Sequence, residues 1–197
     1  MAAILCPAGR FVARYKSLVR RVAVIATASG CGKTTFGRRL AERICVPFVE
    51  LDAIHWQAGW RELDAAELRR RVEPVVSGEA WVVDGSYRGK LGDLVLDAAD
   101  TVVWLDLPRS VWLPRLVVRT IRRIVRREEL WNGNRETLRG AISGPDSLLG
   151  YALHTAPRRR QRYPRELGHL RVARLRTSVE VDAFLRSARR RGPSAET

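Results

Sequence analysis

The sequence predicts an α/β fold in which helices cover both faces of a parallel β-sheet. Two observations lead to this prediction. Short, almost continuously apolar segments recur along the chain, as is typical of strands buried on both faces. Segments whose apolar residues follow helical spacing lie between them. With 197 residues, the chain is long enough for one sizeable core and too short for two ordinary domains.

Five segments have the composition of buried strands. They are RVAVIAT, VPFVELD, GEAWVVDGSY, ADTVVWLDLP and LRVARLRT, at 21–27, 46–52, 78–87, 99–108 and 170–177. Helical patterns follow at 32–44, 64–76 and 178–191, and Ser178 is the expected N-cap of the last helix. We expect an N-terminal extension at 1–20, one domain at 21–190 and a flexible tail at 191–197.

The segment 109–168 interrupts this alternation with about 60 arginine-rich residues. Its first part predicts an amphipathic helix that carries a stripe of arginines, since steps of four, three and four residues return to one face. The stripe consists of Arg115, Arg119, Arg122 and Arg126, while Val117, Ile121, Ile124 and Val125 face elsewhere. Pro114 predicts a kink, or a helix start no earlier than Leu113. WNGNRE should end the helix, and an insertion of this size is typical of a moving lid.

Composition narrows the partners and the location. The formal net charge is +15, and 33 of the 36 cationic side chains are arginines. Such a charge indicates an anionic partner such as a nucleic acid, a nucleotide or a phosphorylated substrate, but it does not choose among them. No apolar run approaches the roughly 18–20 residues of a membrane span, and the first residues lack the pattern of a secretory signal. We therefore expect no membrane partner.

The three cysteines, Cys6, Cys31 and Cys45, lack metal-type spacing. Their odd number favours reduced thiols in a cytoplasmic protein. Cys31 lies in a glycine-rich stretch where backbone amides can favour a thiolate, although a small residue that simply fits is the plainer interpretation.

That stretch, ATASGCGKTTFGRR, is almost a nucleotide-phosphate loop of the form G-x-x-x-x-G-K-S/T, except that Thr27 occupies the first position. The first position marks the strand exit, so Thr27 is acceptable if its φ is negative. A strand before the loop and a helix after it provide the expected setting, and chance is the alternative. Lys33 would supply the cation and Thr34 a hydroxyl ligand for Mg²⁺. The predicted nucleotide-binding residues are Ser29, Gly30, Cys31, Gly32, Lys33, Thr34 and Thr35.

Two aspartates end predicted strands at the edge where open α/β sheets bind ligands. Asp84 would complement Thr34 at Mg²⁺, or it would simply start the turn before Gly85. Asp52 would accept a proton from a substrate hydroxyl or hold that hydroxyl in line, or it would be a turn or cap residue. His55 beside Trp56 receives no chemical role.

Arginines of the 109–168 segment are the candidates for neutralising charge during phosphoryl transfer. Arg115 and Arg119 come first and are counted as catalytic with Lys33 and Asp52, while Arg158 and Arg159 are expected at the nucleotide. The alternative is a solvated helix face, which must hold for several of these side chains.

Together these residues resemble the adenylate-kinase-like and shikimate-kinase-like P-loop phosphotransferases over about 22–190. WVVDGSYR resembles the family's D-G-x-x-R, which implies Asp84 near Mg²⁺ and Arg88 facing the acceptor. RLVVR is similar to the R-x-x-x-R of the lid, at Arg115 and Arg119. VELDAIHWQAGW and ELWNGNRE are closer still to a bacterial group known as DNA topology modulation proteins, or adenylate-kinase-related ATPases. The resemblance implies a three-layer α/β/α fold with strand order 2-3-1-4-5.

The chain departs from true adenylate kinases in three respects. DGSYR lacks the proline of D-G-F-P-R, the stretch between the second and third strands is short at about 28 residues, and lid zinc cysteines are absent. The leading hypothesis is a phosphotransferase that uses ATP and Mg²⁺ and transfers the γ-phosphoryl group to a small-molecule or nucleotide acceptor. The alternative is a nucleic-acid-associated ATPase or a polynucleotide-end kinase, favoured by the charge. A GTPase is disfavoured because the chain lacks N-K-x-D.

Overall fold

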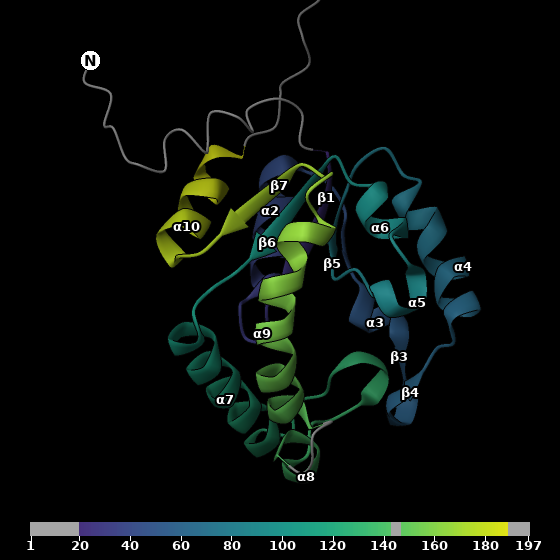
Figure 1. The fold of residues 1–197 in the computed structure, drawn as a ribbon. Helices are drawn as coiled ribbons and strands as arrows, with labels where there is room; N and C mark the ends of the chain where they lie inside the picture. The colour runs from purple at the N-terminus through teal and green to yellow at the C-terminus, as the bar shows by residue number, and fades with distance from the viewer. Residues whose placement is uncertain (1–19, 143–146, 189–197) are drawn as a thin grey trace, which may run out of the picture.

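The computed structural model describes residues 20–142 and 147–188 (Figure 1). The predictions for residues 1–19 and for the tail at 191–197 lie outside the described residues. Five parallel strands form the main sheet, in the spatial order β2 (Phe48–Glu50), β5 (Trp81–Asp84), β1 (Arg21–Ala26), β6 (Thr101–Leu105) and β7 (Val172–Leu175). Within the described ranges, no helix combines the length and apolar composition needed to cross a membrane.

The strand numbering differs from the predicted 2-3-1-4-5 because the sequence reading did not include two short strands. These are β3 (Trp56–Gln57) and β4 (Arg61–Glu62), which pair antiparallel in a separate sheet and are joined by the 3₁₀ turn η1 (Ala58–Trp60). When these two strands are set aside, the order β2-β5-β1-β6-β7 runs second, third, first, fourth and fifth.

Alternate residues of the central strand β1 face opposite sides of the sheet. Val22 and Val24 pack in a core cluster with residues of α2 (Lys33–Ile44), α7 (Arg109–Val125) and α10 (Ser178–Ser187). Ala23 and Ile25 pack on the other side with residues of α4 (Ala65–Val76), α5 (Arg88–Leu91), α6 (Leu94–Asp97) and α9 (Leu148–Glu166). Apolar side chains on both faces of the strand therefore produce a helix–sheet–helix sandwich.

Three predicted boundaries were wrong. The second strand stops at Glu50, so Asp52 lies in the short helix α3 (Leu51–His55) and does not end a strand. Thr177 and not Ser178 is the N-cap of α10, because its side chain accepts a hydrogen bond from the Glu180 amide. The third corrected boundary is the start of α7, at Arg109, four residues before Leu113.

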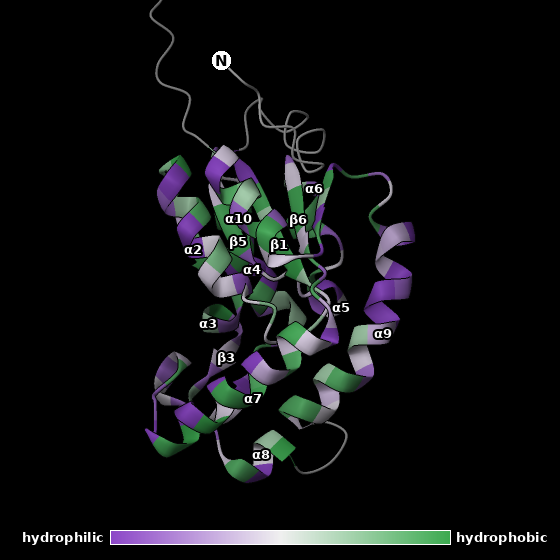
Figure 2. Ribbon diagram, turned by 90° about the vertical axis from the view of Figure 1, so that its left-hand side faces the viewer, coloured by the Kyte–Doolittle hydropathy of each residue, from purple (hydrophilic) through white to green (hydrophobic). Residues whose placement is uncertain are grey.

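Helix α7 buries a narrow face made of Trp112, Leu116 and Thr120. Pro114 lies within the helix on its exposed side. Hydrophobic and hydrophilic residues alternate along the ribbon of α7 (Figure 2). Of the aliphatic residues outside the arginine stripe, Ile121 and Val125 are exposed to solvent, whereas Val117 and Ile124 are half-buried. The helix ends before WNGNRE, as predicted, and the segment continues through the 3₁₀ turn η2 (Trp131–Gly133) and α8 (Leu138–Ile142) to α9.

Candidate active site

The phosphate-loop sequence forms a turn between the carboxyl end of β1 and the N-terminus of α2. Gly30 and Gly32 have φ values of 87° and 86°, which favour glycine. Gly32 is the N-cap of α2 and makes no side-chain cap bond, so the first amides of the helix are left for a ligand. A helix N-terminus of this kind favours an anion.

The two glycines face different surroundings. A Cβ at Gly30 would lie 2.4 Å from the Trp112 carbonyl oxygen and 2.9 Å from Leu116 Cβ, so this glycine allows α7 to pack directly on the loop. A Cβ at Gly32 would meet nothing within 4 Å. The loop is therefore closed on the α7 side at Gly30 and open at Gly32, where a phosphate would lie.

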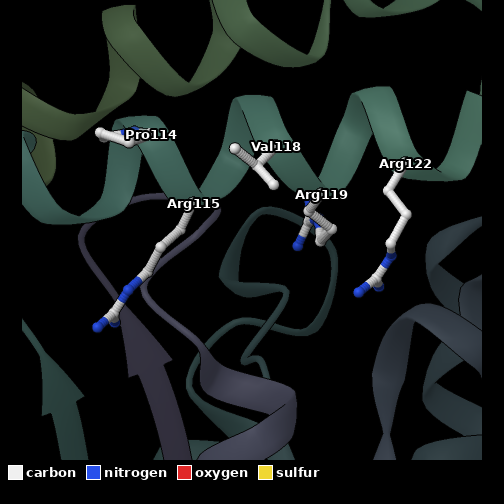
Figure 3. Close-up of a pocket in the computed structure, with 5 residues that line it drawn as sticks. All are labelled: Pro114, Arg115, Val118, Arg119 and Arg122. Atoms are coloured by element: carbon white, nitrogen blue, oxygen red, sulfur yellow. The ribbon is translucent and has the colours of Figure 1, made fainter.

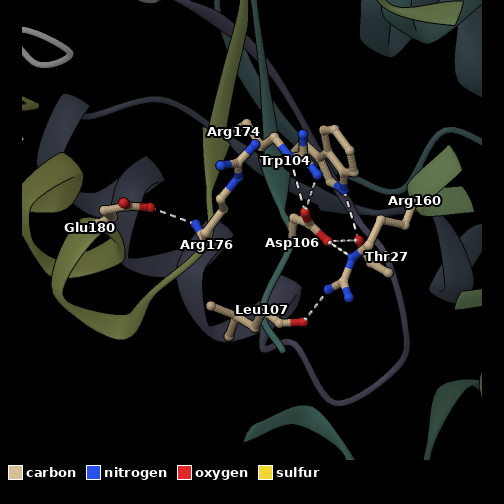
Figure 4. Close-up of polar contacts among 8 residues, drawn as sticks. All are labelled: Thr27, Trp104, Asp106, Leu107, Arg160, Arg174, Arg176 and Glu180. Atoms are coloured by element: carbon tan, nitrogen blue, oxygen red, sulfur yellow. Dashed lines mark hydrogen bonds and ion pairs between the residues drawn. The ribbon is translucent and has the colours of Figure 1, made fainter. Parts of the chain in front are cut away.

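Thr27, the departure from the motif, is an anchor of the loop (Figure 4). Thr27 has a negative φ and is 1% exposed, and its hydroxyl donates a hydrogen bond to Asp106 Oδ1 at 2.7 Å. The same hydroxyl accepts a hydrogen bond from Trp104 Nε1 at 2.9 Å. Asp106 also binds Arg160 of α9 and, with two hydrogen bonds, Arg174 of β7. A glycine at position 27 could make neither side-chain bond.

Asp106 is ionised because its partners outweigh its burial. Burial raises the pKa of this carboxyl, but hydrogen bonds from Thr27, Arg160 and Arg174 bring the pKa below its ordinary value. The network therefore contributes stability above the ordinary aspartate pKa and loses it as the pH falls through the lowered value. It connects the start of the loop to α9.

Lys33, Thr34 and Asp84 meet at the open side of the loop. Lys33 Nζ lies 2.8 Å from Asp84 Oδ1, and the Thr34 hydroxyl donates to Asp84 Oδ2 at 2.6 Å. Burial lowers the pKa of Lys33, but the Asp84 and Asp52 carboxylates outweigh burial and raise it. Lys33 is therefore a cation at neutral pH, paired with the carboxylate predicted to lie near Mg²⁺.

Glu50 is a site residue that the sequence reasoning missed. It is in register with Asp84 on the neighbouring strand, and the Thr34 hydroxyl lies 3.3 Å from Glu50 Oε1. Burial, then Asp84 and Asp52, raises the pKa of Glu50, as expected where carboxylates gather. Its place two residues before Asp52, at the end of an apolar segment, was the available signal.

These oxygens fit a magnesium ion. Mg²⁺ in nucleotide sites takes one or two carboxylates, substrate phosphates and water, and the Thr34 hydroxyl with Asp84 and Glu50 offers such a set. No group of three histidine, cysteine or acidic side chains suited to a metal occurs within residues 20–142 and 147–188. Nucleotide phosphates and water would supply the remaining ligands of a magnesium ion at Thr34 and Asp84.

Asp52 lies beside this group and is fixed by Tyr87. The Tyr87 hydroxyl donates to Asp52 Oδ1 at 2.6 Å, and burial, followed by Asp52, raises the pKa of Tyr87. Tyr87 itself has a φ of 45°. His55 is 1% exposed, its ring packs against Trp56 and Tyr87, and burial lowers its pKa, which matches a neutral packing residue.

Three arginines of the predicted stripe line an open pocket on α7, together with Pro114 and Val118 (Figure 3). Arg119 is half-buried, and its Nε makes no hydrogen bond to the described part of the chain. Burial and then Arg123 lower the pKa of Arg119, while the Asp52 carboxylate opposes that change. Arg119 therefore has a half-buried Nε in this pocket that is unpaired within the described residues, whereas Arg115 is exposed and lies 3.4 Å from the Ser178 hydroxyl.

The remaining arginines predicted at the site are Arg159, Arg158 and Arg88. Arg159 of α9 donates to the Tyr151 hydroxyl at 2.8 Å, its guanidinium lies over the Tyr151 ring, and its charge opposes the raised pKa of Lys33. Arg158 is exposed. Arg88, expected at the acceptor, forms ion pairs with Asp93 and Glu166 in this structure.

The other loop residues have simpler environments. Ser29 is half-buried, and Thr35 is exposed at the start of α2. Cys31 is 3% exposed, and burial raises the pKa of its thiol. The thiolate alternative is therefore disfavoured, and Cys31 is a small buried residue of the loop.

The same fold occurs in solved kinase structures. A shikimate kinase from Bacteroides thetaiotaomicron has a TM-score of 0.53 at 14% identity, over 86% of this chain and 96% of that chain. A gluconokinase from Sinorhizobium meliloti 1021 has a TM-score of 0.51 at 22% identity, over 86% and 89%. A shikimate kinase from Acinetobacter baumannii, in complex with shikimate, has a TM-score of 0.51 at 18% identity, over 89% and 93%. The chain shares its overall fold with these three structures.

No protein-family model and no curated protein matches the chain. Because the structural relatives are less than 25% identical, they establish the fold, and the activity has to be inferred from the site.

Proposed function

We propose that the protein is an ATP- and Mg²⁺-dependent phosphotransferase that moves the γ-phosphoryl group to a small-molecule or nucleotide acceptor. The observation that carries this proposal is the meeting of Lys33, Thr34 and Asp84 at the open side of Gly32. A cation, a hydroxyl and a carboxylate beside free helix amides are the groups that a nucleoside triphosphate with its metal requires.

The loop would bind the phosphates through its backbone amides, and Lys33 would move from Asp84 to a β/γ-phosphate oxygen. Thr34 and Asp84 would hold the magnesium ion, with Glu50 beside them, and bound Mg²⁺ would neutralise charge on the β- and γ-phosphates. The carboxylate that pairs with Lys33 in the free protein thereby keeps a cationic partner, so neither charge is left buried alone.

Asp52 would orient the acceptor and receive its proton, since it lies near Lys33 and is ordered by Tyr87. Arg119 and Arg159 would neutralise the charge that develops on the transferred group; in support, the charge of Arg119 is felt at Asp52 and that of Arg159 at Lys33. For Arg115 and Arg158 to contact phosphate, their side chains must leave the exposed positions that they hold in this structure, so part of the 109–168 segment must rearrange around the packed start of α7. We propose that it does so as a lid.

A screen for ADP release tests this proposal. The full chain is incubated with MgATP and a panel of polyols, hydroxy acids and nucleoside monophosphates, with Lys33→Ala as the matched inactive variant. We expect at least one acceptor to raise ADP release above the rate in water, and Lys33→Ala to abolish it. Equal rates for the wild type and Lys33→Ala with every acceptor would contradict the assignment.

No specific observation at the site favours the alternative of a nucleic-acid-associated ATPase or polynucleotide-end kinase. Several arginines that contribute to the charge are paired with carboxylates, among them Arg88, Arg123, Arg160 and Arg174. If nucleic acid were a substrate or activator, ADP release should rise with added DNA or RNA and fall steeply with salt. We expect neither effect.

We also propose that the chain belongs to the topology-modulation group and acts in the cytoplasm. The group assignment is supported by VELDAIHWQAGW and WVVDGSYR, and the location by the cysteine content of the sequence. The group name by itself supplies no acceptor.

A further inference from the structure

The turn η2 lies against the short elements that follow β2. We define the η2 loop as residues 128–136; its tip contacts α3, β3 and η1. Hydrogen bonds join residues about 75 positions apart in the chain here, and most of them are made by the side-chain amides of Asn132 and Asn134. The η2 loop therefore binds backbone groups in and directly after α3.

Asn132 binds the C-terminal end of α3. Its Nδ2 donates to the Trp56 carbonyl at 2.5 Å and lies 3.4 Å from the Ala53 carbonyl. A five-residue helix can satisfy few of its own carbonyls, so a donor at its end stabilises much of the element. Asn132 itself has a φ of 55°, a conformation that asparagine tolerates better than most residues.

Asn134 makes the second connection with both ends of its side-chain amide. Its Nδ2 donates to the Gln57 carbonyl at 2.9 Å, and its Oδ1 accepts from the Trp60 amide at 2.8 Å. Asn134 is only 3% exposed, so these bonds are shielded from water. Trp60 adds an indole bond to the Arg135 carbonyl at 3.2 Å and an edge contact with Trp131.

The other side of the η2 loop is tied to α7. Arg123 Nη1 lies 2.8 Å from Glu136 Oε1 in an ion pair whose side chains are only 19% and 12% exposed. Arg123 is four residues after Arg119, one turn along the same helix. The loop therefore bridges the helix that carries Arg119 and the helix that carries Asp52.

We propose that Asn132 and Asn134 are positioning residues for Asp52. Docking of the η2 loop orders α3, and this holds the Asp52 carboxylate against the Tyr87 hydroxyl. The proposal rests on the proposed function, because Asp52 is assigned there to the acceptor. It adds that the acceptor side of the site is complete only when the η2 loop is docked.

Hydrogen exchange and steady-state kinetics on the full chain test this proposal together. The variants are Asn132→Ala and Asn134→Ala. Arg135→Ala is the matched control on the same loop, since it removes an exposed side chain and keeps the backbone carbonyl that Trp60 binds. Exchange is followed in the segments 51–60 and 33–44, and ADP release is measured with MgATP and water or any active acceptor from the screen.

We expect each asparagine variant to speed hydrogen exchange in 51–60 by about tenfold, because each loses one or two hydrogen bonds to this segment. Exchange in 33–44 should be unchanged. The kcat for ADP release should fall by a similar factor, while the KM for MgATP stays within about twofold because the phosphate loop is not altered. Arg135→Ala should match the wild type in both measurements.

Unchanged exchange in 51–60, or an equal increase in Arg135→Ala, would overturn the proposal. A KM for MgATP that rises while kcat is constant would also overturn it, because the η2 loop would then act on the nucleotide. If the wild type releases no ADP, the proposed function fails, and the exchange data still decide whether these asparagines order α3.

Discussion

At the scale of single residues, Thr27 explains how the loop departs from its motif without losing its form. Where the motif has glycine, the Thr27 hydroxyl makes two buried hydrogen bonds, to Asp106 and Trp104. Because its φ is negative, a glycine at this position would gain nothing from its flexibility.

Thr27→Gly should therefore destabilise the protein, although it restores the usual motif. We expect the free energy of unfolding to fall by about 3 kcal/mol, from two lost hydrogen bonds and the greater freedom of the unfolded chain. Thr27→Ser keeps the hydroxyl and should cost about 1 kcal/mol for the missing methyl group. Urea unfolding measures both, and equal stability of the Gly and Ser variants would show that the hydroxyl does not anchor the loop.

Asp52→Asn separates transfer from nucleotide binding. The amide oxygen can still accept the Tyr87 hydrogen bond, but the group cannot take a proton. We expect transfer to the acceptor to fall by about 10²–10⁴-fold, the usual contribution of a general base. The affinity for MgATP, measured by calorimetry, should be nearly unchanged; a large loss of affinity would reassign Asp52 to the nucleotide or the fold.

Glu50 gives the site a pH dependence whose sign can be stated. Its pKa is raised in the folded protein, so its contribution to stability is present at low pH and is lost as the pH rises through the raised value. In the absence of Mg²⁺, Glu50→Gln should be more stable than the wild type at pH 7, and the gap should narrow as the pH falls toward about 4.5. Urea unfolding across this range measures the gap, and a constant gap would contradict the raised pKa.

At the scale of elements, the loop and α7 pack so closely that only glycine fits between them. Gly30 and Gly32 have almost the same φ but different neighbours, which makes them a matched pair. Alanine at either position adopts an unfavourable φ, and alanine at Gly30 also collides with the Trp112 carbonyl.

We expect Gly30→Ala to be less stable than Gly32→Ala by about 1–3 kcal/mol, the usual cost of overpacking. Gly32→Ala should keep the fold but weaken MgATP binding by about tenfold, because its methyl group would lie where a phosphate binds. Thermal unfolding and calorimetry measure the two effects. Reversal of the stability order would show that α7 does not pack on the loop in solution.

The elements that the sequence predicted are those determined by local pattern. Apolar strands and helical periodicity placed all five sheet strands, and the loop followed from its glycines and Lys33. Pro114 predicted either a kink or a start no earlier than Leu113, and the second alternative was wrong because the helix accommodates Pro114 on an exposed face. The segment 51–62 was missed because its very short elements depend on the distant side chains of Asn132 and Asn134.

At the scale of the whole molecule, the site is assembled from segments that lie far apart in the sequence. The sequence could nominate Lys33, Thr34, Asp84 and Asp52, because each follows a recognisable strand or loop. Asp106 also follows a predicted strand, but the sequence could not find its partners Thr27, Arg160 and Arg174, which are 54–79 residues away in the chain. Such contacts arise from the fold, and a single sequence carries no local signal for them.

The proposed activity depends most directly on the phosphate loop, and calorimetric titration of MgATP into the wild type and Lys33→Ala tests whether this loop binds the nucleotide. We predict saturable heat for one site in the wild type and none in Lys33→Ala, since Lys33 supplies the cation that the phosphates need. Absence of heat in the wild type with any purine triphosphate and magnesium, or equal binding by both proteins, would contradict the central claim.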